Sequence, residues 1–341
     1  MRGSGAPDRR PRSLLTIVAM SVKWGIMSTA RINRLFLAGA SQSTELEVVA
    51  VASRTRDGAE RFAREHGIGR AVAGYEALLD DPEIEVVYIP LPNGLHVEWA
   101  VRALQAGKHV LCEKPLGRRA GEVRRAFDVA EREGRVLMEA FMYRHHPQTG
   151  RLLELVRDGA VGRVRVIRAA FGFPLRGRSD IRMEAALDGG ALMDVGCYCV
   201  NGARMIAGEP ERVSAEQTIG GDGVDVTFAA TMRFPGDVLA HFDAGLAVAE
   251  RDELEVIGEE GALFLDDPWH CRRPGIQLRR DGAAQRIEVE AADSYQLEAE
   301  NMSAAVRGRA DPLLGRNDGV AQARAIEALY ESAQSGTMVV P

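Results

Sequence analysis

The sequence predicts an α/β domain followed by an α+β domain: a doubly wound parallel sheet of the Rossmann type, then a large, mostly antiparallel open sheet. Two observations support this prediction. Between Val22 and Ala140, short β-branched apolar runs alternate with amphipathic helical segments, as in parallel sheets covered on both faces. After Phe141, the strand-like segments alternate apolar and polar residues and are joined by hairpin turns, which is typical of antiparallel sheets.

The first half contains five apolar runs separated by helical segments. We expect strands at Val22–Met27, Leu46–Ala52, Val86–Leu91, His109–Cys112 and Val136–Ala140. We expect helices at Arg31–Gln42, Arg56–His66, Tyr75–Leu79, His96–Ala106 and Ala120–Glu133. Glycine follows three of these helices closely, at Gly67, Gly107 and Gly134, and glycine is the usual residue at a helix C-terminus.

The second half has a different pattern. The alternating segments predict strands at Val164–Phe173, Val224–Phe234, Val238–Gly245, Asp252–Ile257, Ala262–Leu265 and Gln285–Val289. Helices are expected at Leu192–Ala207, Gln296–Arg307 and Gly319–Ser335. We therefore expect one domain at residues 21–143 and a second at 144–341. Residues 1–20 are interpreted as a disordered or mis-started extension, with an export signal as the alternative because basic residues precede a short apolar run.

Composition excludes several classes of function. The chain of 341 residues has a net charge of −6 with Lys and Arg interleaved among acids, which argues against a nucleic-acid partner. No apolar stretch approaches the roughly 20 residues of a membrane helix. Four cysteines without CxxC spacing indicate a reducing, cytoplasmic protein. Because no His, Cys and Asp residues have metal-ligand spacing, we expect no metal.

The first strand-to-helix turn, residues 25–33, is a candidate dinucleotide site. On the usual G-x-G-x-x-G spacing this chain has Ser28, Ala30 and Asn33. Small side chains still let a pyrophosphate approach the helix N-terminus, where backbone N–H groups bind anions. An ordinary helix-capping turn is the alternative.

The end of the second strand favours NADP(H) over NAD(H). NAD sites place an acid there, whereas here Ser53 and Arg54 follow Ala52, and the first acid is Asp57. Serine and arginine suit a 2′-phosphate, although these residues could simply begin a solvated helix. Asn93 and His96 follow the third strand, where they could reach ribose or nicotinamide or serve as turn and capping residues.

Two segments carry candidate catalytic groups. A strand ends in Glu113-Lys114-Pro115, which places the lysine at the sheet edge where ligands bind. On the expected helix after Gly189, Asp194, Tyr198 and Asn201 share one face. A phenol near an ammonium is suited to proton transfer, since the ammonium stabilises phenolate. A solvated lysine and a core tyrosine bonded to Asp194 are the alternatives.

With these residues in place, the chain resembles the glucose–fructose oxidoreductase, inositol dehydrogenase and rhizopine-oxidoreductase superfamily (Gfo/Idh/MocA). The resemblance is carried by Glu113-Lys114-Pro115, by residues 138–147 and by residues 189–198. Asp194 and Tyr198 stand in a D-x-x-x-Y pattern, which resembles the sugar and dihydrodiol dehydrogenase branch. The replaced glycines at Ser28, Ala30 and Asn33 depart from the common family turn and put its detailed phosphate contacts in doubt.

The resemblance implies hydride transfer between nicotinamide and a sugar, polyol or dihydrodiol CH–OH or C=O group. Tyr198 is the implied general acid/base, Lys114 lowers its pKa and holds the substrate hydroxyl, and Asp194 orients Lys114 or the substrate. Arg182 and Asn201 are candidate substrate residues, whereas His145 and His146 are interpreted as linker structure. The candidate cofactor residues are Ser28, Thr29, Ala30, Arg31, Ile32, Ser53, Arg54, Leu91, Asn93, His96, Glu113, Lys114 and Arg144.

Three readings of function remain open at this point. The leading one is an NAD(P)-dependent sugar or polyol dehydrogenase, and a physiological keto-sugar reductase is equally consistent. A protein that senses NADP(H) without turnover is the third reading, but it has no need of Lys114, Asp194 and Tyr198 together. We also expect a homodimer or homotetramer, formed through an apolar outer face of the second sheet.

Overall fold

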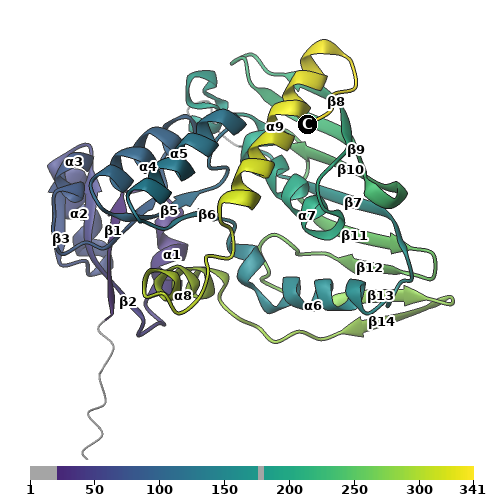
Figure 1. Cartoon of the computed structure of the whole chain (residues 1–341), viewed down its shortest axis with the longest axis horizontal. Coiled ribbons are helices and arrows are strands. Elements are labelled where there is room, and N and C mark those ends of the chain that lie inside the picture. The colour runs from purple at the N-terminus through teal and green to yellow at the C-terminus, as the bar shows by residue number, and fades with distance from the viewer. Residues whose placement is uncertain (1–20, 176–179) are drawn as a thin grey trace, which may run out of the picture.

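The computed structural model describes residues 21–175 and 180–341, and the expected N-terminal extension lies outside these residues. The chain forms two sheets side by side, joined by helices (Figure 1). This arrangement confirms the predicted fold class. No helix in the described ranges is long and apolar enough to cross a bilayer.

The first sheet has six parallel strands in the order β3-β2-β1-β4-β5-β6. Its strands are β1 (Val22–Met27), β2 (Leu46–Ser53), β3 (Arg70–Ala73), β4 (Val86–Ile89), β5 (His109–Glu113) and β6 (Leu137–Ala140). Its helices are α1 (Asn33–Ala40), α2 (Arg56–His66), α3 (Tyr75–Leu79), α4 (His96–Gln105) and α5 (Ala120–Arg132). The short strand β3 was not predicted, because its apolar part is only the three residues 71–73 and none of its four residues is fully buried.

The second sheet has eight strands in the order β14-β13-β12-β11-β7-β10-β9-β8, in which only the β7–β10 pair is parallel. Its strands are β7 (Val164–Gly172), β8 (Arg212–Ile219), β9 (Asp225–Phe234), β10 (Val238–Gly245), β11 (Arg251–Gly258), β12 (Ala262–Leu265), β13 (Ile276–Arg280) and β14 (Ala283–Ile287). Strands β8 and β13 were not predicted. Strand β8 places only Val213 and Ala215 in the core, which is too few apolar residues for a clear alternating pattern.

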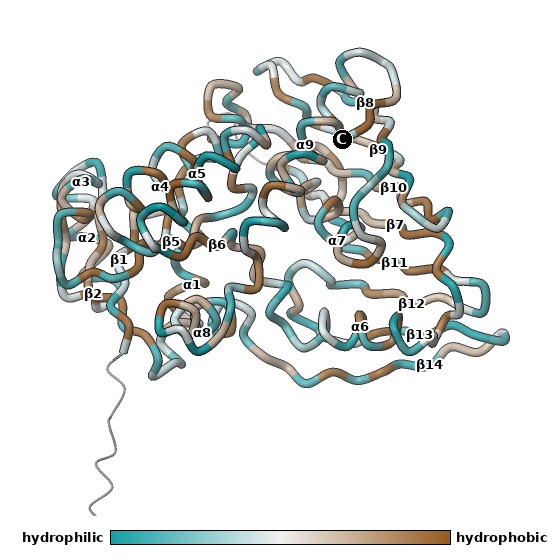
Figure 2. The backbone as a smooth tube through the Cα atoms, in the orientation of Figure 1, coloured by the Kyte–Doolittle hydropathy of each residue, from teal (hydrophilic) through white to brown (hydrophobic). Residues whose placement is uncertain are grey.

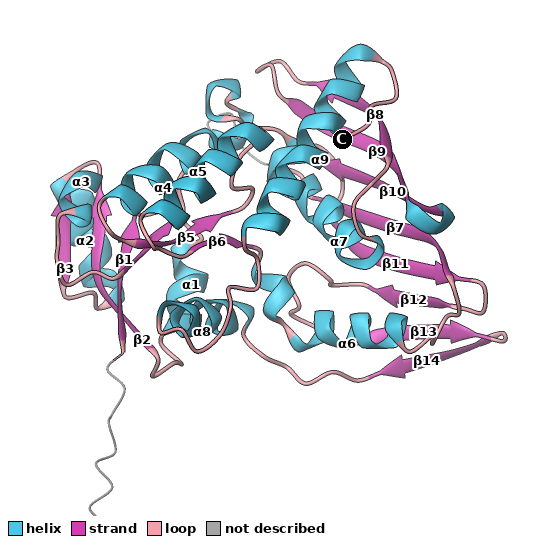
Figure 3. Ribbon diagram, viewed as in Figure 1, coloured by secondary structure: helices cyan, strands magenta, loops and turns pink. Residues whose placement is uncertain are grey.

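Beyond the first sheet, the described residues form the α-helices α6 (Pro147–Arg157), α7 (Cys197–Ala207), α8 (Ser294–Val306) and α9 (Arg316–Ser335). Helix α6 begins at Pro147 with His146 as its N-cap, so the expected linker histidines partly serve helix initiation. Helices α6, α7 and α9 lie along one face of the second sheet (Figure 3). Helix α8 instead packs against α1, so the chain returns to the first sheet after leaving it. The expected division at residues 143 and 144 stays a prediction.

Two cores cover the faces of the first sheet. Trp24, Ile26 and Tyr88 are fully buried on one face with α1 and α8, whereas Val87 and Val110 are buried on the other with α4 and α5. In Figure 2, β5 and β6 are hydrophobic along much of their length, and α4 and α5 alternate between hydrophobic and hydrophilic. This pattern is what buried parallel strands under amphipathic helices require.

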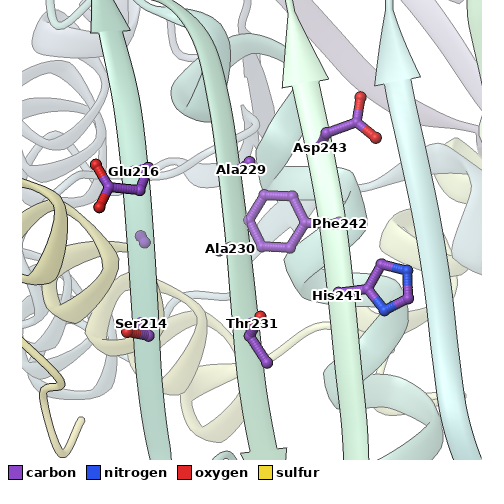
Figure 4. Close-up of a pocket in the computed structure, with 9 residues that line it drawn as sticks. Ser214, Glu216, Ala229, Ala230, Thr231, His241, Phe242 and Asp243 are labelled. Carbon is purple, nitrogen blue, oxygen red and sulfur yellow. The ribbon is translucent and has the colours of Figure 1, made fainter.

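The helix-free face of the second sheet is polar, which corrects the expected apolar outer face. On this face, Glu255 pairs with Arg168 and Arg279 from the neighbouring strands. A pocket on β8, β9 and β10 is lined by polar and charged side chains, including Glu216, Thr231, His241 and Asp243 (Figure 4). The alternation of these strands was predicted correctly, but the outward positions carry charged residues that form ion pairs instead of an apolar surface.

Candidate active site

The lysine of the Glu-Lys-Pro segment lies at the carboxyl end of β5. The Lys114–Pro115 peptide bond is cis, and the backbone beyond it is held from two sides. The Nδ1 atom of His96 lies 2.9 Å from the carbonyl oxygen of Pro115, and the N–H of Leu116 donates to Glu139 Oε1 at 2.8 Å. The position of Lys114 is therefore fixed by buried side chains from α4 and β6.

Lys114 reaches across to the segment that precedes α7. Its Nζ donates to the backbone oxygen of Asp194 at 2.8 Å and lies 3.6 Å from Asp194 Oδ1. Arg182 Nε lies 2.8 Å from the other carboxylate oxygen. Burial is the largest influence and would lower the pKa of Lys114, but the Asp194 carboxylate together with Cys197 and Glu113 outweighs it, so that pKa lies above its ordinary value. The structure thus brings together Lys114, Asp194 and Arg182, and the lysine is a cation at neutral pH.

Tyr198 lies beside Lys114, but its hydroxyl points elsewhere. The Lys114 Nζ lies 4.8 Å from the centre of the Tyr198 ring, whereas the hydroxyl donates to the Met142 sulfur at 3.8 Å. Phe141 and Phe171 contact the ring edge-to-face at 5.3 Å. Burial raises the pKa of Tyr198 well above its ordinary value. This corrects the expectation that Lys114 lowers that pKa: the ammonium faces the ring, not the phenol oxygen.

Asn201 does not join the face that carries Asp194. Residues Leu192–Gly196 form a π-helical turn, which inserts extra backbone and breaks the expected spacing. Asn201 is fully buried, and its Oδ1 accepts hydrogen bonds from Tyr143 at 2.6 Å and Arg144 at 3.0 Å. Its expected role in substrate binding is therefore corrected to a structural one. Arg144, expected on the cofactor, also lies 3.8 Å from Asp318 and belongs to this network.

The β1–α1 turn lies at the switch point of the first sheet, because the strand order reverses between β1 and β4. Ser28 has φ of +122°, a conformation that favours glycine, so it takes the place of a motif glycine. Asn33 Nδ2 donates to the backbone oxygen of Ser28 at 2.8 Å, while its buried Oδ1 has no partner among the described residues. Thr29 and Arg31 are exposed beside this turn, and Ala30 and Ile32 are half-buried.

The end of β2 presents Ser53 half-buried and Arg54 exposed. A carboxylate appears only at Asp57, in the first turn of α2. Together with the small turn at Ser28 and the exposed N-terminal residues of α1, these groups fit a dinucleotide with an extra phosphate on its ribose.

Residues at the ends of β4 and β5 serve mainly to hold the site. His96 is buried, with Nδ1 and Nε2 2.9 and 2.7 Å from the carbonyl oxygens of Pro115 and Leu91. The expected contact of His96 with ribose or nicotinamide is corrected, because both ring nitrogens face protein carbonyls. Leu91 is buried, Asn93 Nδ2 donates to the Asp188 carbonyl at 3.0 Å, and Glu113 accepts from the Tyr88 hydroxyl at 2.6 Å.

One cluster near the site has no counterpart in the sequence analysis. Asp252, Asp267 and His270 place one ligand-type atom each within 4.8 Å of one another, although they are separated in sequence and lie on β11 and the β12–β13 loop. Only the fold brings them together, so spacing rules could not find them. The expectation that the chain binds no metal stays a prediction.

Comparison with known proteins agrees with this geometry. Residues 22–141 match the family described as "Oxidoreductase family, NAD-binding Rossmann fold", and residues 150–264 match the "GFO/IDH/MocA C-terminal domain". The chain is 39% identical over 323 residues to D-xylose 1-dehydrogenase (NADP(+)) 2 of Haloferax volcanii, covering 93% of this chain and 98% of that protein.

Two further proteins are informative. The chain is 38% identical over 258 residues to trans-1,2-dihydrobenzene-1,2-diol dehydrogenase of Mus musculus, covering 73% of this chain and 76% of that protein. The crystal structure of a 3-ketoreductase from Actinomadura kijaniata in complex with NADP and TDP-benzene superposes with a TM-score of 0.87 at 32% identity, covering 92% of this chain and 98% of that one.

Proposed function

The chain belongs to the Gfo/Idh/MocA family of oxidoreductases, and from this premise we propose that it transfers hydride between NADP(H) and a CH–OH or C=O carbon of a sugar, polyol or dihydrodiol. The observation that carries the proposal is the contact of Lys114 with Asp194 at 2.8 Å and with the Tyr198 ring at 4.8 Å. It joins a cation at the edge of the first sheet to Asp194 and Tyr198, which lie on the π-helical turn and on helix α7 against the second sheet.

Lys114 is the proposed donor to the reacting substrate oxygen. Asp194 raises the pKa of Lys114, so the ammonium persists at neutral pH, and a cation in a partly dry site stabilises an oxygen that gains negative charge. The ammonium donates to the Asp194 backbone carbonyl at 2.8 Å and lies 3.6 Å from Oδ1 of its carboxylate, while Arg182 holds the other carboxylate oxygen at 2.8 Å. This positioning reduces the entropy lost on reaching the transition state.

Tyr198 is proposed as the general acid rather than as a base. Burial raises the pKa of Tyr198 well above its ordinary value, so its hydroxyl keeps its proton and can donate it. When the Tyr198 hydroxyl turns from the Met142 sulfur toward the substrate, it and Lys114 would both donate to the reacting oxygen, which stabilises the transition state of hydride transfer in either direction. In addition, crystal structures are known for variants of the Actinomadura kijaniata ketoreductase in which one lysine or one tyrosine is replaced. The two replaced positions are separated by the same number of residues along the sequence as Lys114 and Tyr198.

NADP(H) is the proposed cofactor. It would supply or accept the hydride, while the chain's own residues bind it: the β1–α1 turn at Ser28 holds the pyrophosphate, and Ser53 and Arg54 hold the 2′-phosphate. The basic and hydroxyl side chains at the end of β2, and the absence of an acid before Asp57, support this preference. The NADP-bound ketoreductase and the NADP(+)-dependent xylose dehydrogenase support it as well.

We also propose a cytoplasmic homo-oligomer. All four cysteines are free and buried, which suits a reducing compartment. The second sheet leaves one face without helices (Figure 3), and this face is the proposed contact between copies. Light scattering after size-exclusion chromatography measures the state, and a monomer at micromolar concentration contradicts the proposal.

A substrate screen with Tyr198→Phe tests the enzymatic proposal. The wild-type protein should change NADPH absorbance with at least one aldose, keto-sugar or dihydrodiol. Tyr198→Phe should lower kcat for carbonyl reduction by about 10²- to 10⁴-fold, the usual worth of a positioned acid, and leave NADPH affinity unchanged. Near-normal turnover by this variant refutes the role of Tyr198, and no turnover by the wild type refutes the enzymatic function.

A further inference from the structure

His270 and Asp252 form a polar pair beside the proposed active site. We propose that this pair binds a hydroxyl group of the substrate away from the reacting carbon, and so selects polyhydroxylated sugars over arene dihydrodiols. This inference rests on the proposed function and specifies its substrate class.

The strand register places the pair on the side of the sheet that faces Tyr198. Asp252 on β11 lies directly opposite Phe171 on β7, and residues opposite each other in neighbouring strands point to the same face. The Phe171 ring contacts the Tyr198 ring at 5.3 Å, and the His270 imidazole contacts the Phe171 ring at 5.3 Å. A single aromatic ring therefore separates His270 from the proposed acid.

Arg182 lies over Phe173, the residue that follows the end of β7. Its guanidinium carbon is 5.7 Å from the centre of the Phe173 ring, and the Phe173 N–H donates to the Gly245 carbonyl at 3.0 Å, so the chain continues beside β10 two residues beyond Phe171. Two residues of extended strand span on the order of 7 Å, which is comparable to a sugar ring with its hydroxyls. A sugar whose reacting oxygen lies at Lys114 and Arg182 would thus extend toward His270.

Asp252 is held rigidly and in turn orients the imidazole. Its Oδ1 accepts the N–H of Trp269 at 3.1 Å, and its Oδ2 lies 2.5 Å from His270 Nδ1. Trp269 is itself fixed, because its Nε1 donates to the Ala170 carbonyl at 3.1 Å. With Nδ1 engaged by the carboxylate, Nε2 is the ring atom left for a ligand. The His270 side chain is 29% exposed and that of Asp252 is 13% exposed, so the imidazole is the accessible member.

The contacts favour a hydrogen-bonding pair over a metal site. Asp252 Oδ2 is hydrogen-bonded directly to His270 Nδ1, and a ring nitrogen that donates its N–H to a carboxylate has no lone pair left for a cation. The third member of the cluster, Asp267, accepts the backbone N–H of Arg273 at 2.7 Å. A neutral hydroxyl suits this environment better than a phosphate, since two carboxylates lie next to the imidazole.

The chemistry of the two substrate classes gives the selectivity. In trans-1,2-dihydrobenzene-1,2-diol both hydroxyls are on adjacent carbons, so none remains for a group several ångströms from the reacting carbon. An aldose carries hydroxyls around its whole ring. Losing a hydrogen bond that leaves a polar partner unpaired costs roughly 5- to 100-fold in kcat/KM.

The test compares D-glucose, its 3-, 4- and 6-deoxy analogues, and trans-1,2-dihydrobenzene-1,2-diol as substrates with NADP⁺. We expect the wild type to turn over glucose better than the dihydrodiol and to lose roughly 5- to 100-fold in kcat/KM with at least one deoxy analogue. In His270→Ala, kcat/KM for glucose should fall to the value measured with that deoxy analogue, so the difference between the two sugars should disappear. The kcat/KM for the dihydrodiol should stay the same. Asp252→Asn should give a smaller change in the same direction.

Two controls separate binding from folding. His66→Ala removes another imidazole beside a carboxylate, 3.8 Å from Glu65 at the end of α2, and should keep the wild-type substrate pattern. His270→Gln retains a polar group of similar reach and should restore part of the discrimination, and thermal unfolding of each variant reports its stability.

Three outcomes are distinct. Unchanged penalties for all deoxy analogues in His270→Ala overturn the inference. A wild-type preference for the dihydrodiol also overturns it but leaves the oxidoreductase proposal intact. Failure of the wild type to turn over any of these compounds, or the keto-sugars of the wider screen, overturns the proposed function itself.

Discussion

Replacing Lys114 by methionine separates the proposed catalytic role of this lysine from its structural one. Methionine keeps the length of the aliphatic chain but removes the ammonium that contacts Asp194 at 2.8 Å and 3.6 Å. If Lys114 donates to the substrate oxygen, the loss should resemble removal of one oxyanion donor. That change typically costs 10²- to 10³-fold in kcat, or about 2.7–4 kcal/mol.

The structural cost should be small by comparison. The Asp194 carboxylate retains Arg182 at 2.8 Å after the substitution, so no charge is left buried and unpaired. What remains is the loss of one hydrogen bond to the Asp194 carbonyl, worth about 1 kcal/mol. For a chain of this size, this corresponds to a decrease in Tm of only a few degrees.

The assay follows NADPH oxidation or formation with the best substrate from the screen, together with NADPH binding by fluorescence and Tm by calorimetry. We expect kcat to fall by at least 100-fold, consistent with the donor role, with NADPH affinity within about threefold of wild type. Lys108→Met is the matched control. Lys108 precedes β5 at its opposite end, and its Nζ donates to the carbonyls of Asp81 and Ile84 at 2.5 and 2.9 Å.

The control should show the reverse pattern. Lys108→Met leaves two carbonyl acceptors unpaired and should destabilise the fold by about 1–3 kcal/mol without changing kcat. If Lys114→Met keeps kcat within threefold of wild type, or loses stability as Lys108→Met does with no larger effect on turnover, the reasoning is refuted.

Three further predictions concern other groups. Arg54→Ala should raise KM for NADPH about 10- to 100-fold, as expected for the loss of one charge-assisted hydrogen bond, and should leave KM for NADH unchanged. Equal effects on both cofactors contradict the proposed phosphate contact. Asn201→Ala should lower Tm by several degrees because it unpairs Tyr143 and Arg144 in a buried network, with KM for substrate unchanged; a specific rise in KM would restore its substrate role. Burial raises the pKa of Glu139 to about 8 from an ordinary value of 4.5. Between these two values the folded state holds a proton that the unfolded state releases. The free energy of unfolding of the wild type should therefore fall as pH rises from about 4.5 to 8. Glu139→Gln should flatten this dependence in urea unfolding at pH 5, 6.5 and 8, and an unchanged slope would contradict it.

Much of the architecture could be predicted because local patterns determine it. The runs at Val22–Met27 and Val238–Gly245 form strands with those bounds. A continuous apolar run indicates a strand buried on both faces, and an alternating run indicates a strand with one buried face. Helix α2 at Arg56–His66 ends at Gly67 with φ of +69°, as glycine at that position indicates. The elements missed, such as β3 and β8, are short or only half-buried and are defined by their partners rather than by their own residues.

The site was predictable in composition but not in geometry. Lys114, Asp194 and Tyr198 were identified from a strand end and a helix, and they do lie together. The π-helical turn at Leu192–Gly196 separates Asp194 from the face that carries Asn201, and only the packing around α7 turns the Tyr198 hydroxyl toward Met142 and buries Asn201. A single extra residue in a turn has no sequence signal that separates it from an ordinary helix.

The sequence by itself determined most of the strands and helices in their order, the class of chemistry and the charged groups available for it, because periodicity and motif spacing act over a few residues; β3, β8, β13 and α6 were not among the predicted elements. Only the tertiary structure decided which of these groups meet. Lys114 and Asp194 are 80 residues apart, and Asp252 and His270 are brought together by the pairing of β7, β11 and the following loop. Such contacts depend on how whole elements pack, and the orientation and pKa of each side chain follow from the neighbours that packing provides.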